Sequence, residues 1–531
     1  MNLKKIRIKN LRSLIDTKEV EIKPLTILVG KNSTGKSTFL RFFPLMKQTL
    51  MTRKNEPILW YGKDYVDFGS FKESISKNKI GECINFQFEF DLDLDYWNNN
   101  SIKVVLEVEV NENLFNRICL RIGKVQIDLS SNSEKMYSLK INDKIQNANL
   151  ISFNTEFNSA FIPRFMFLPI PKENVSEENQ KRQIFSSKQY FSELIKSSPG
   201  IFTEYNSIDR FLDELNFSDI ESMSVFDDEF IYRICSEIEL EKDIYNYEEE
   251  FDDDILISDL QDITKDNFEN FCELLIGHEL DTIFERINLY FNDYFSGVHY
   301  IAPVRASAQR YYRLQGLAVD EIDSQGENIP MMLKHLSYKQ KKDFEEWVLD
   351  NFNFKITTEN QGGHVNLSIS FDKKTKLNLA DTGFGYSQVL PIIVLLWRVN
   401  NKMKDQSHFN NKEFNFRNMM SSKNPYTVVI EQPELHLHPA MQAQLTDVFA
   451  NCITLAKDMN FDLNIIIETH SETIINRLGQ QVAREKINSE LVNILIFGDS
   501  QGHVNTKIES VKYDEEGVIE DWPLGFFYPE N

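Results

Sequence analysis

The feature that most constrains this chain is a glycine-bounded loop near its start. Residues Gly30–Thr38 read GKNSTGKST and fit the pattern G-x-x-x-x-G-K-[ST]. The apolar run Leu25–Val29 precedes the loop and Phe39–Phe43 follows it, so the sequence predicts a strand, a loop and a helix in that order. Backbone N–H groups of such a loop, together with the N-terminus of the helix, form a seat for phosphate oxygens. The pattern therefore predicts a nucleoside triphosphate site.

The residue types in this loop assign roles within that site. Lys36 is expected to reach the β- and γ-phosphates, and the hydroxyl of Ser37 is expected to hold Mg²⁺. ATP and Mg²⁺ are the expected cofactors. The residues expected to contact the nucleotide are Gly30, Asn32, Ser33, Thr34, Gly35, Lys36, Ser37 and Thr38.

Composition limits the class of protein. A chain of 531 residues suggests two or three domains, and 41% hydrophobic with 26% charged residues is ordinary for a soluble globular protein. A net charge of −23 disfavours general nucleic-acid binding, so any such contact needs a local basic patch. The five cysteines form no C-x-x-C pair, and no apolar run reaches the ~18 residues of a membrane span. We expect a cytoplasmic protein that does not enter a membrane.

The alternation of apolar residues predicts an N-terminal part of the nucleotide domain at 1–75 and an antiparallel β-lobe at 76–174. In that lobe the segments 84–94, 102–110 and 118–129 each alternate as a strand with one solvated face.

Two further segments complete the predicted organisation. Charged, helical patterns indicate an inserted helical domain at 175–298, where the acidic run Glu248–Asp254 is either a solvated loop or a docking site. The nucleotide domain resumes at 299–531, where apolar β-branched runs alternate with helices such as Val389–Val399. The expected fold class is α/β with a mostly parallel sheet.

Two strand ends in the C-terminal part supply candidate catalytic groups. The apolar run Thr427–Ile430 ends at Glu431, followed by Gln432 and Glu434. An acid at the end of a buried strand beside a phosphate loop is placed to hold Mg²⁺, unless it merely faces solvent.

The second strand, Asn464–Ile467, runs into Glu468-Thr469-His470-Ser471. His470 is expected near the γ-phosphate or the attacking water, and a structural histidine is the alternative.

A second anion seat is predicted before the helix Val389–Val399. Its sequence, DTGFGYSQ at Asp381–Gln388, places small residues at a helix N-terminus. Two such seats far apart in one chain suggest that the second one seals a nucleotide held by another copy. The alternative is an ordinary turn with Ser387 as the N-cap.

Together these motifs resemble the ABC-type ATPase superfamily, in particular the head domains of SMC-like and OLD-like prokaryotic AAA-family ATPases. Gly30–Thr38 resembles Walker A, Thr427–Glu434 Walker B, His470 the switch histidine, and Asp381–Gln388 a divergent signature motif. The likeness covers roughly 1–75 and 330–531. EQPELHLHP, GFGYSQVLP and DWPLGFF (Asp521–Phe527) are similar to a narrower group, the Septu-type ATPases of bacterial antiviral cassettes, including retron-linked ones.

The resemblance implies an ABC head that forms a head-to-tail homodimer or higher oligomer around ATP. It implies that Gly385 and Ser387 contact the γ-phosphate held by the partner copy, with Gly383 as an alternative because the spacing departs from the usual signature motif. It also implies ATPase activity and a separate nuclease effector of the HNH type, regulated by the nucleotide.

One residue departs from the superfamily pattern. Gln432 stands where relatives carry a second acid that acts as general base, and losing a general base costs ~10²–10⁴ in rate. Either Glu434 or His470 supplies the base, or turnover is slow and ATP mainly holds the dimer closed. Glu434 could equally be an acid that offsets the dipole of the following helix.

Other residues leave two readings open. His436 and His438 suit dimer-interface or capping roles better than Zn²⁺, because no Cys or third His is near in sequence. An Arg/Tyr cluster formed by Arg305, Arg310, Tyr311, Tyr312 and Arg313 is either a nucleic-acid patch or a structural cluster. At the level of function, the alternatives are a non-hydrolysing ATP-gated scaffold and an SMC- or OLD-like ATPase that acts on DNA.

Overall fold

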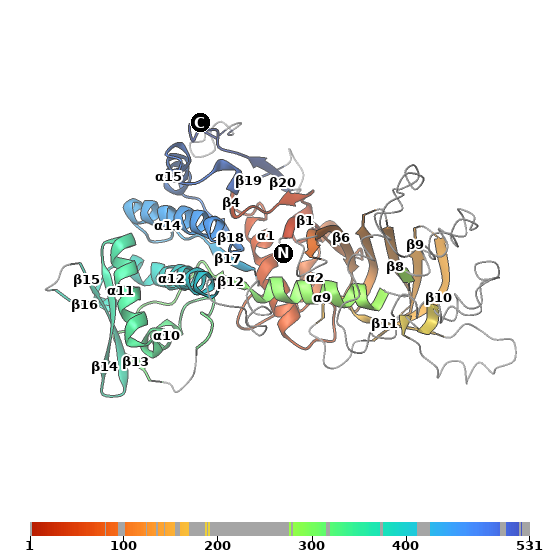
Figure 1. Ribbon diagram of the computed structural model, residues 1–531, viewed down its shortest axis with the longest axis horizontal. Helices are drawn as coiled ribbons and strands as arrows, with labels where there is room; N and C mark the ends of the chain where they lie inside the picture. The colour runs from red at the N-terminus through yellow and green to blue at the C-terminus, as the bar shows by residue number, and fades with distance from the viewer. Residues whose placement is uncertain are drawn as a thin grey trace, which may run out of the picture. The chain divides into compact units, whose positions relative to one another are not determined.

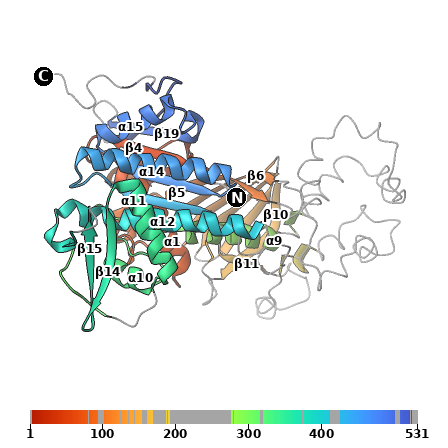
Figure 2. The same cartoon turned by 60° about the vertical axis from the view of Figure 1, so that its left-hand side comes forward.

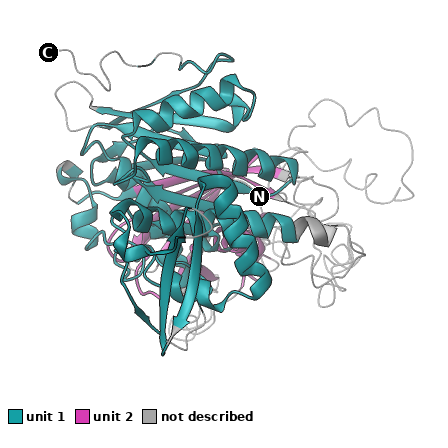
Figure 3. Cartoon of the chain, turned by 90° about the vertical axis from the view of Figure 1, so that its left-hand side faces the viewer, with its two compact units in different colours: residues 1–52, 58–84, 293–531 teal, residues 53–57, 85–292 magenta. Residues whose placement is uncertain are grey.

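The computed structural model describes residues 3–79, 81–93, 101–153 with gaps at 124, 134–135 and 143, 160–168, 186–191 except 188, 276–277, 280–314, 319–371, 375–410, 425–499, 506–519 and 522. The chain divides into two compact units (Figure 3). Unit 1 contains residues 1–52, 58–84 and 293–531, and unit 2 contains residues 53–57 and 85–292.

The centre of unit 1 is a mostly parallel sheet (Figure 1). Among the described residues its strands lie in the order β12 (Val298–Ile301), β17 (Tyr426–Glu431), β18 (Leu463–Glu468), β4 (Leu25–Gly30), β19 (Val492–Asp499) and β20 (Thr506–Val511). The first five run parallel, and β20 pairs antiparallel with β19. The carboxyl ends of β4, β17 and β18 therefore meet at one edge.

The burial of the three central strands shows that the sheet is covered on both faces. Every residue of β4, β17 and β18 is buried, as expected for parallel strands between two helical layers. Successive side chains alternate between the faces. Ile27, Val428 and Ile465 belong to the apolar core that includes α12 and α14. Glu431 and Glu468 each stand an odd number of residues from these core residues on their strands, so their side chains point to the opposite face, where α1 lies.

Among the described residues, the helices that cover this sheet are α1 (Lys36–Met51), α12 (Phe384–Asn410), α14 (Pro439–Asp458) and α15 (Glu472–Ala483). Helix α1 packs on β4, β12, β17 and β18, while α12 and α14 pack side by side on the opposite face (Figure 1). The helix predicted at Val389–Val399 begins five residues earlier and continues to Asn410.

Smaller elements complete unit 1. A small antiparallel sheet packs against two helices (Figure 2). It contains β13 (Tyr312–Arg313), β14 (Lys355–Gln361), β15 (His364–Ser370) and β16 (Leu377–Asn378), with α10 (Ile329–His335) and α11 (Tyr338–Phe352). The remaining elements are β1 (Leu3–Leu11), β2 (Leu14–Asp16), β3 (Val20–Glu21), α2 (Phe71–Ser74), η1 (Lys77–Lys79), η3 (Leu379–Asp381) and η4 (Ser489–Leu491).

Unit 2 contains the predicted antiparallel lobe. Its strands are β5 (Ile84–Asp93), β6 (Ser101–Val110), β7 (Phe115–Ile122), β8 (Val125–Ser133), β9 (Met136–Ile141), β10 (Lys144–Phe153) and β11 (Arg164–Phe167). Phe88, Phe161 and Phe291 of helix α9 (Leu280–Ser296) form ring contacts in its core. The single strand expected at 118–129 is wrong. It is a hairpin of β7 and β8, because Gly123 adopts a left-handed φ of 56° and turns the chain.

The expected fold class, α/β with a mostly parallel sheet and an antiparallel lobe, is confirmed. Most of the expected helical insertion at 175–298, the acidic run Glu248–Asp254 and all of the segment Asp521–Phe527 except Trp522 lie outside the described residues. The boundaries at 75, 174 and 298 stay predictions. In the part of the chain that the structure describes, no helix is long and apolar enough to cross a membrane.

Candidate nucleotide site

The phosphate loop joins β4 to α1, as the sequence predicts. Its backbone depends on glycine at two positions. A Cβ on Gly30 would lie 2.3 Å from the carbonyl oxygen of Phe497, and Gly35 has a φ of 94° as the N-cap of α1. Ser33 also has a left-handed φ, of 65°. These conformations turn the loop around the N-terminus of α1, which carries partial positive charge.

Lys36 is folded back on the loop. Its side chain is buried, and its Nζ donates to the carbonyl oxygens of Gly30, at 3.0 Å, and Lys31, at 2.6 Å. Burial lowers the pKa of Lys36, and the nearby Glu468 carboxylate opposes that shift. The ammonium is thus held at the mouth of the loop, where phosphate oxygens would exchange for backbone carbonyls.

The acid that contacts the loop is Glu468, at the end of β18. The hydroxyl of Ser37 donates to Oε1 of Glu468 at 2.9 Å. Burial and the charge of Glu431 raise the pKa of Glu468 to about 7. Sequence reasoning gave Glu468 no role, although its strand, NIIIE, repeats the pattern TVVIE that ends at Glu431.

The expected magnesium ligand Glu431 has other partners. Arg41 forms a two-bond ion pair with it, with Nε to Oε1 at 2.7 Å and Nη2 to Oε2 at 2.9 Å. The hydroxyl of Tyr300 also donates to Oε1, at 2.5 Å. The Glu431 carboxylate raises the pKa of Arg41, and burial raises that of Tyr300. Both carboxylate oxygens are therefore engaged by Arg41 and Tyr300, and the role of Glu431 as a magnesium ligand stays a prediction.

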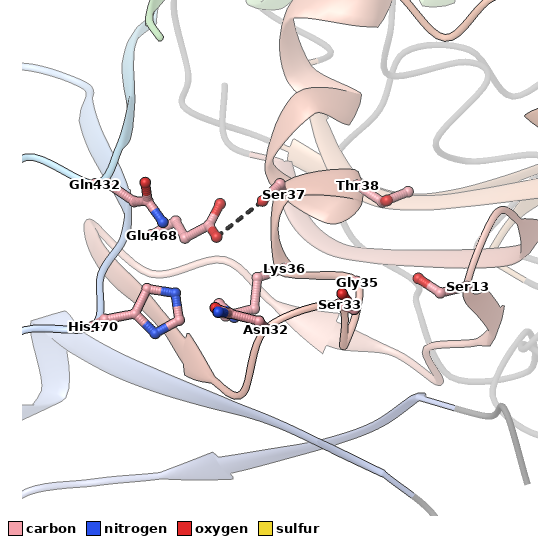
Figure 4. Close-up of a pocket in the computed structure, with 10 residues that line it drawn as sticks. All are labelled: Ser13, Asn32, Ser33, Gly35, Lys36, Ser37, Thr38, Gln432, Glu468 and His470. Atoms are coloured by element: carbon pink, nitrogen blue, oxygen red, sulfur yellow. Dashed lines mark hydrogen bonds between the residues drawn. The ribbon is translucent and has the colours of Figure 1, made fainter. Parts of the chain in front are cut away.

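A cavity of about 360 Å³ lies over the loop (Figure 4). It is lined by Ser13, Asn32, Ser33, Gly35, Lys36, Ser37, Thr38, Gln432, Glu468 and His470. Eight of these ten residues were predicted, and Ser13 and Glu468 were not. The predicted residues Gly30, Thr34, Glu431, Glu434, Gly385 and Ser387 are not in this lining.

Gln432 directly follows β17 and lines the cavity. Its backbone is left-handed, with a φ of 44°, and its N–H donates to the carbonyl oxygen of Glu468 at 2.8 Å. Arg305 fixes the same turn from the other side, since its Nη2 donates to the carbonyl oxygens of Glu431 at 2.7 Å and Gln432 at 3.2 Å. Two neighbours therefore fix the backbone of Gln432 at the cavity wall.

Glu434 holds the turn that carries His470. Its Oε2 accepts from the hydroxyl of Thr469 at 2.9 Å, and its Oε1 accepts from the backbone N–H of His470 at 2.7 Å. Burial raises the pKa of Glu434. Both oxygens of Glu434 are thus engaged, Glu434 does not line the cavity, and its contacts hold the backbone that carries His470. Burial lowers the pKa of His470, which favours its neutral ring.

The residues present fit a nucleotide with its magnesium. The loop supplies backbone N–H groups and a lysine, and Ser37 supplies a hydroxyl. The other oxygen of Glu468, Oε2, is buried and has no hydrogen-bond partner among the described residues. A hard cation prefers such oxygen donors.

The comparison with protein-family models decides the family. The model described as AAA ATPase domain matches residues 1–475. The chain belongs to the AAA ATPase domain family. It is therefore an ATP-binding ATPase, and the family implies the use of ATP with Mg²⁺.

Other comparisons add little to this assignment. No curated protein matches this ATPase. Among solved structures, it is similar to the Smc head domain with an extended coiled coil bound to the C-terminal domain of ScpA from Pyrococcus furiosus, at 11% identity, 96% coverage of both chains and a TM-score of 0.33. It is also similar to the SMC head domain from Thermotoga maritima, at 10% identity, 96% coverage of this chain, 98% of that chain and a TM-score of 0.33. At these scores the likeness carries no conclusion about function.

The predicted second anion seat of this ATPase, Asp381–Gln388, begins at the end of η3 and continues into the first turn of α12. Ser387 is not the N-cap, because the helix begins at Phe384, and its hydroxyl donates to the carbonyl oxygen of Phe384 at 2.7 Å. Gly385 lies against the turn after β17, where a Cβ would be 2.5 Å from the carbonyl oxygen of His436. The Phe384 ring is 47% exposed and contacts the His436 ring.

The remaining candidates separate into buried and exposed residues. His438 caps α14, because its Nδ1 accepts from the N–H of Ala440 at 3.2 Å. No metal-binding cluster occurs among the residues described. Arg305 is only 3% exposed, so it cannot belong to a surface patch for nucleic acid. Arg310, Tyr311 and Arg313 are exposed, and Arg310 pairs with Asp381.

Proposed function

We propose that this AAA ATPase turns ATP over slowly between two copies of the chain and that the nucleotide state regulates a separate nuclease effector. One observation carries the slow turnover. The cavity wall presents an amide, Gln432, at the position directly after the strand-end acid of β17. An amide cannot accept the proton of the attacking water, and a missing general base costs ~10²–10⁴ in rate.

The residues of the cavity account for binding. The loop N–H groups and Lys36 hold the phosphates, and Ser37 with a strand-end acid holds the magnesium. When bound, magnesium neutralises charge on the phosphate oxygens. His470 reaches the cavity from the turn that Glu434 fixes, with a neutral ring favoured, and so is the side chain best placed to orient or deprotonate water.

The proposed dimer follows from the second anion seat. Gly385 and Ser387 do not line the cavity of their own chain. Phe384, beside them at the start of α12, is exposed. Ser387 is buried and its hydroxyl is bonded within α12, so it is not presented to another copy. The exposed start of α12 at Phe384 supports a seat that completes the site of another copy, in the head-to-tail manner that the motif resemblance implies. The effector and the antiviral role rest on the likeness of EQPELHLHP and GFGYSQVLP to Septu-type ATPases.

Light scattering tests dimerisation. We expect the mass to double with ATP and Mg²⁺, to stay at one chain with ADP, and to stay at one chain in Lys36→Ala with either nucleotide. An unchanged mass with ATP would contradict the dimer.

Steady-state phosphate release tests turnover. We expect a slow rate that Lys36→Ala abolishes. Gln432 also favours a second function, a non-hydrolysing ATP-gated scaffold, and ATP-driven dimerisation with no phosphate release would select it.

The effector is tested with a nuclease of the HNH type, the class that the motif resemblance implies. We expect its DNA cleavage to change when the ATPase is added and to respond to ATP against ADP. DNA binding by the ATPase alone, lost on Arg310→Ala with Arg313→Ala, would instead support an ATPase that acts on DNA directly.

A further inference from the structure

Two glutamates end neighbouring strands beside α1. Glu431 of β17 and Glu468 of β18 are register partners in the parallel ladder. Their side chains therefore leave the sheet on the same face. On α1, Ser37 and Arg41 stand four residues apart and share a face of the helix. Ser37 contacts Glu468, and Arg41 contacts Glu431.

The negative charge of the Glu431 carboxylate is neutralised by the guanidinium of Arg41. It is 2% exposed and receives two bonds from Arg41 and one from Tyr300. A cation that bound to Glu431 would first have to displace a guanidinium held by two hydrogen bonds.

The Glu468 carboxylate has no such partner. Its Oε1 accepts the bond from Ser37, and its Oε2 is buried without a hydrogen-bond partner among the described residues. The residue is 3% exposed, yet it lines the cavity over the phosphate loop, and Figure 4 shows its carboxylate turned toward Ser37. A buried carboxylate oxygen that lacks a donor is costly. A metal ion held in the cavity that Glu468 lines would give this carboxylate a partner that the described residues do not supply.

We propose that Glu468, together with Ser37, supplies the protein ligands of the magnesium ion, and that Glu431 serves as the structural anion of Arg41. The inference rests on the proposed ATP site. The carboxylate that binds the metal then comes from the strand next to β4, one strand closer to the loop than the strand-end acid of β17. Mg²⁺ commonly takes one or two carboxylates together with substrate phosphates, which suits one acid and one hydroxyl.

Manganese binding tests this assignment without using turnover. Free Mn²⁺ is measured by electron paramagnetic resonance during titration of the full chain with a non-hydrolysable ATP analogue. Fluorescent-analogue binding in EDTA is measured in parallel. We expect Glu468→Gln to weaken Mn²⁺ by about tenfold or more, since even supporting groups around a metal contribute that much. Its metal-free analogue affinity should hold or rise, because a negative charge near the phosphates is lost.

Glu431→Gln is the discriminating arm. We expect its Mn²⁺ affinity to fall clearly less than that of Glu468→Gln, because Glu431 does not contact Ser37 or line the cavity. If Glu431→Gln alone does not fold, the double variant Arg41→Met with Glu431→Gln replaces it, since that change removes both charges of the pair.

The outcomes separate the two proposals. If the parent binds no analogue with or without metal, the proposed ATP site fails. If the parent binds Mn²⁺ with the analogue and Glu468→Gln binds it equally well, the assignment of Glu468 is overturned while the ATP site stands. An equal loss in both glutamate variants overturns the exclusion of Glu431.

Discussion

The ends of β17 and β18 look interchangeable in sequence and differ in the structure. TVVIE and NIIIE are both apolar runs that end in glutamate, they lie side by side in register, and both glutamates are almost fully buried. Glu431 meets a guanidinium, whereas Glu468 meets a hydroxyl and keeps an oxygen free of hydrogen bonds with the described residues.

Helix α1 makes this difference. Ser37 lies at its first turn against β18, and Arg41 lies one turn later against β17. Lys47 continues the series on β12, where its Nζ donates to the carbonyl oxygen of Val298 at 2.6 Å. The position along α1 therefore decides whether a strand-end glutamate lines the cavity, as Glu468 does, or pairs with an arginine outside its lining, as Glu431 does.

The largest effect is expected when the scaffold pair is broken. Arg41→Met should lower the free energy of unfolding by about 3–5 kcal/mol, because it leaves the Glu431 charge buried without its cation. Urea denaturation measures this. Arg477→Met is the matched control, because Arg477 makes the same two-bond contact with Asp447, whose side chain is 29% exposed. The control should lower the free energy of unfolding by less, about 1 kcal/mol or below. Equal losses of stability in the two variants would contradict the role of burial.

The sequence predicted what depends on local pattern. The loop Gly30–Thr38, the strands at 427–430 and 464–467 and the lobe of alternating strands follow from short-range signals. Eight residues of the cavity lining were predicted for the same reason, since most of them belong to the loop itself.

Contacts between distant segments escaped prediction. Ser37 contacts one of two similar strand ends, and which one depends on the strand order β17, β18, β4 and on the rotation of α1. The sequence of neither strand determines these two features. The sequence left open whether Arg305 belongs to a nucleic-acid patch or to a structural cluster, and the structure buries it against the turn after β17. The break at Gly123 was missed because the alternation continues on both sides of it.

The turns after the two strands offer the next test. The turn after β17 packs against α12, where a Cβ on Gly385 would come within 2.5 Å of the carbonyl oxygen of His436. Gly385→Ala should cost about 1–3 kcal/mol of stability, since backbone must move. Gly383→Ala is the control, because a Cβ at Gly383 would meet nothing within 4 Å among the described residues beyond its chain neighbours. Thermal unfolding of the two variants compares them, and a neutral Gly385→Ala would show that the turn yields without cost.

A pH measurement extends the comparison to β12. Burial lowers the pKa of His299 to about 4, while Glu321 opposes the shift and Lys47 and Lys402 add to it. Between about pH 7.5 and 5.5 the unfolded chain takes up a proton at His299 and the folded chain does not, so stability falls as the pH falls. His299→Gln should remove about 1.5 kcal/mol of that fall. Urea unfolding at the two pH values checks this, and a parallel fall in both proteins would contradict it.

The smallest folding effect is expected at the cavity end of α1. Ser37→Ala removes one hydrogen bond to Glu468 and no ion pair, so it should cost about 0.5–1.5 kcal/mol of stability. Its effect on Mn²⁺ binding with the ATP analogue should nevertheless be large, and Ser37→Thr should restore it by returning the hydroxyl. Arg41→Met should show the opposite ranking, with a large loss of stability and little change in metal affinity of the folded fraction. If both variants lost stability and metal affinity in the same proportion, the two strand ends would form one cooperative site, and the division between scaffold and metal acid would be wrong.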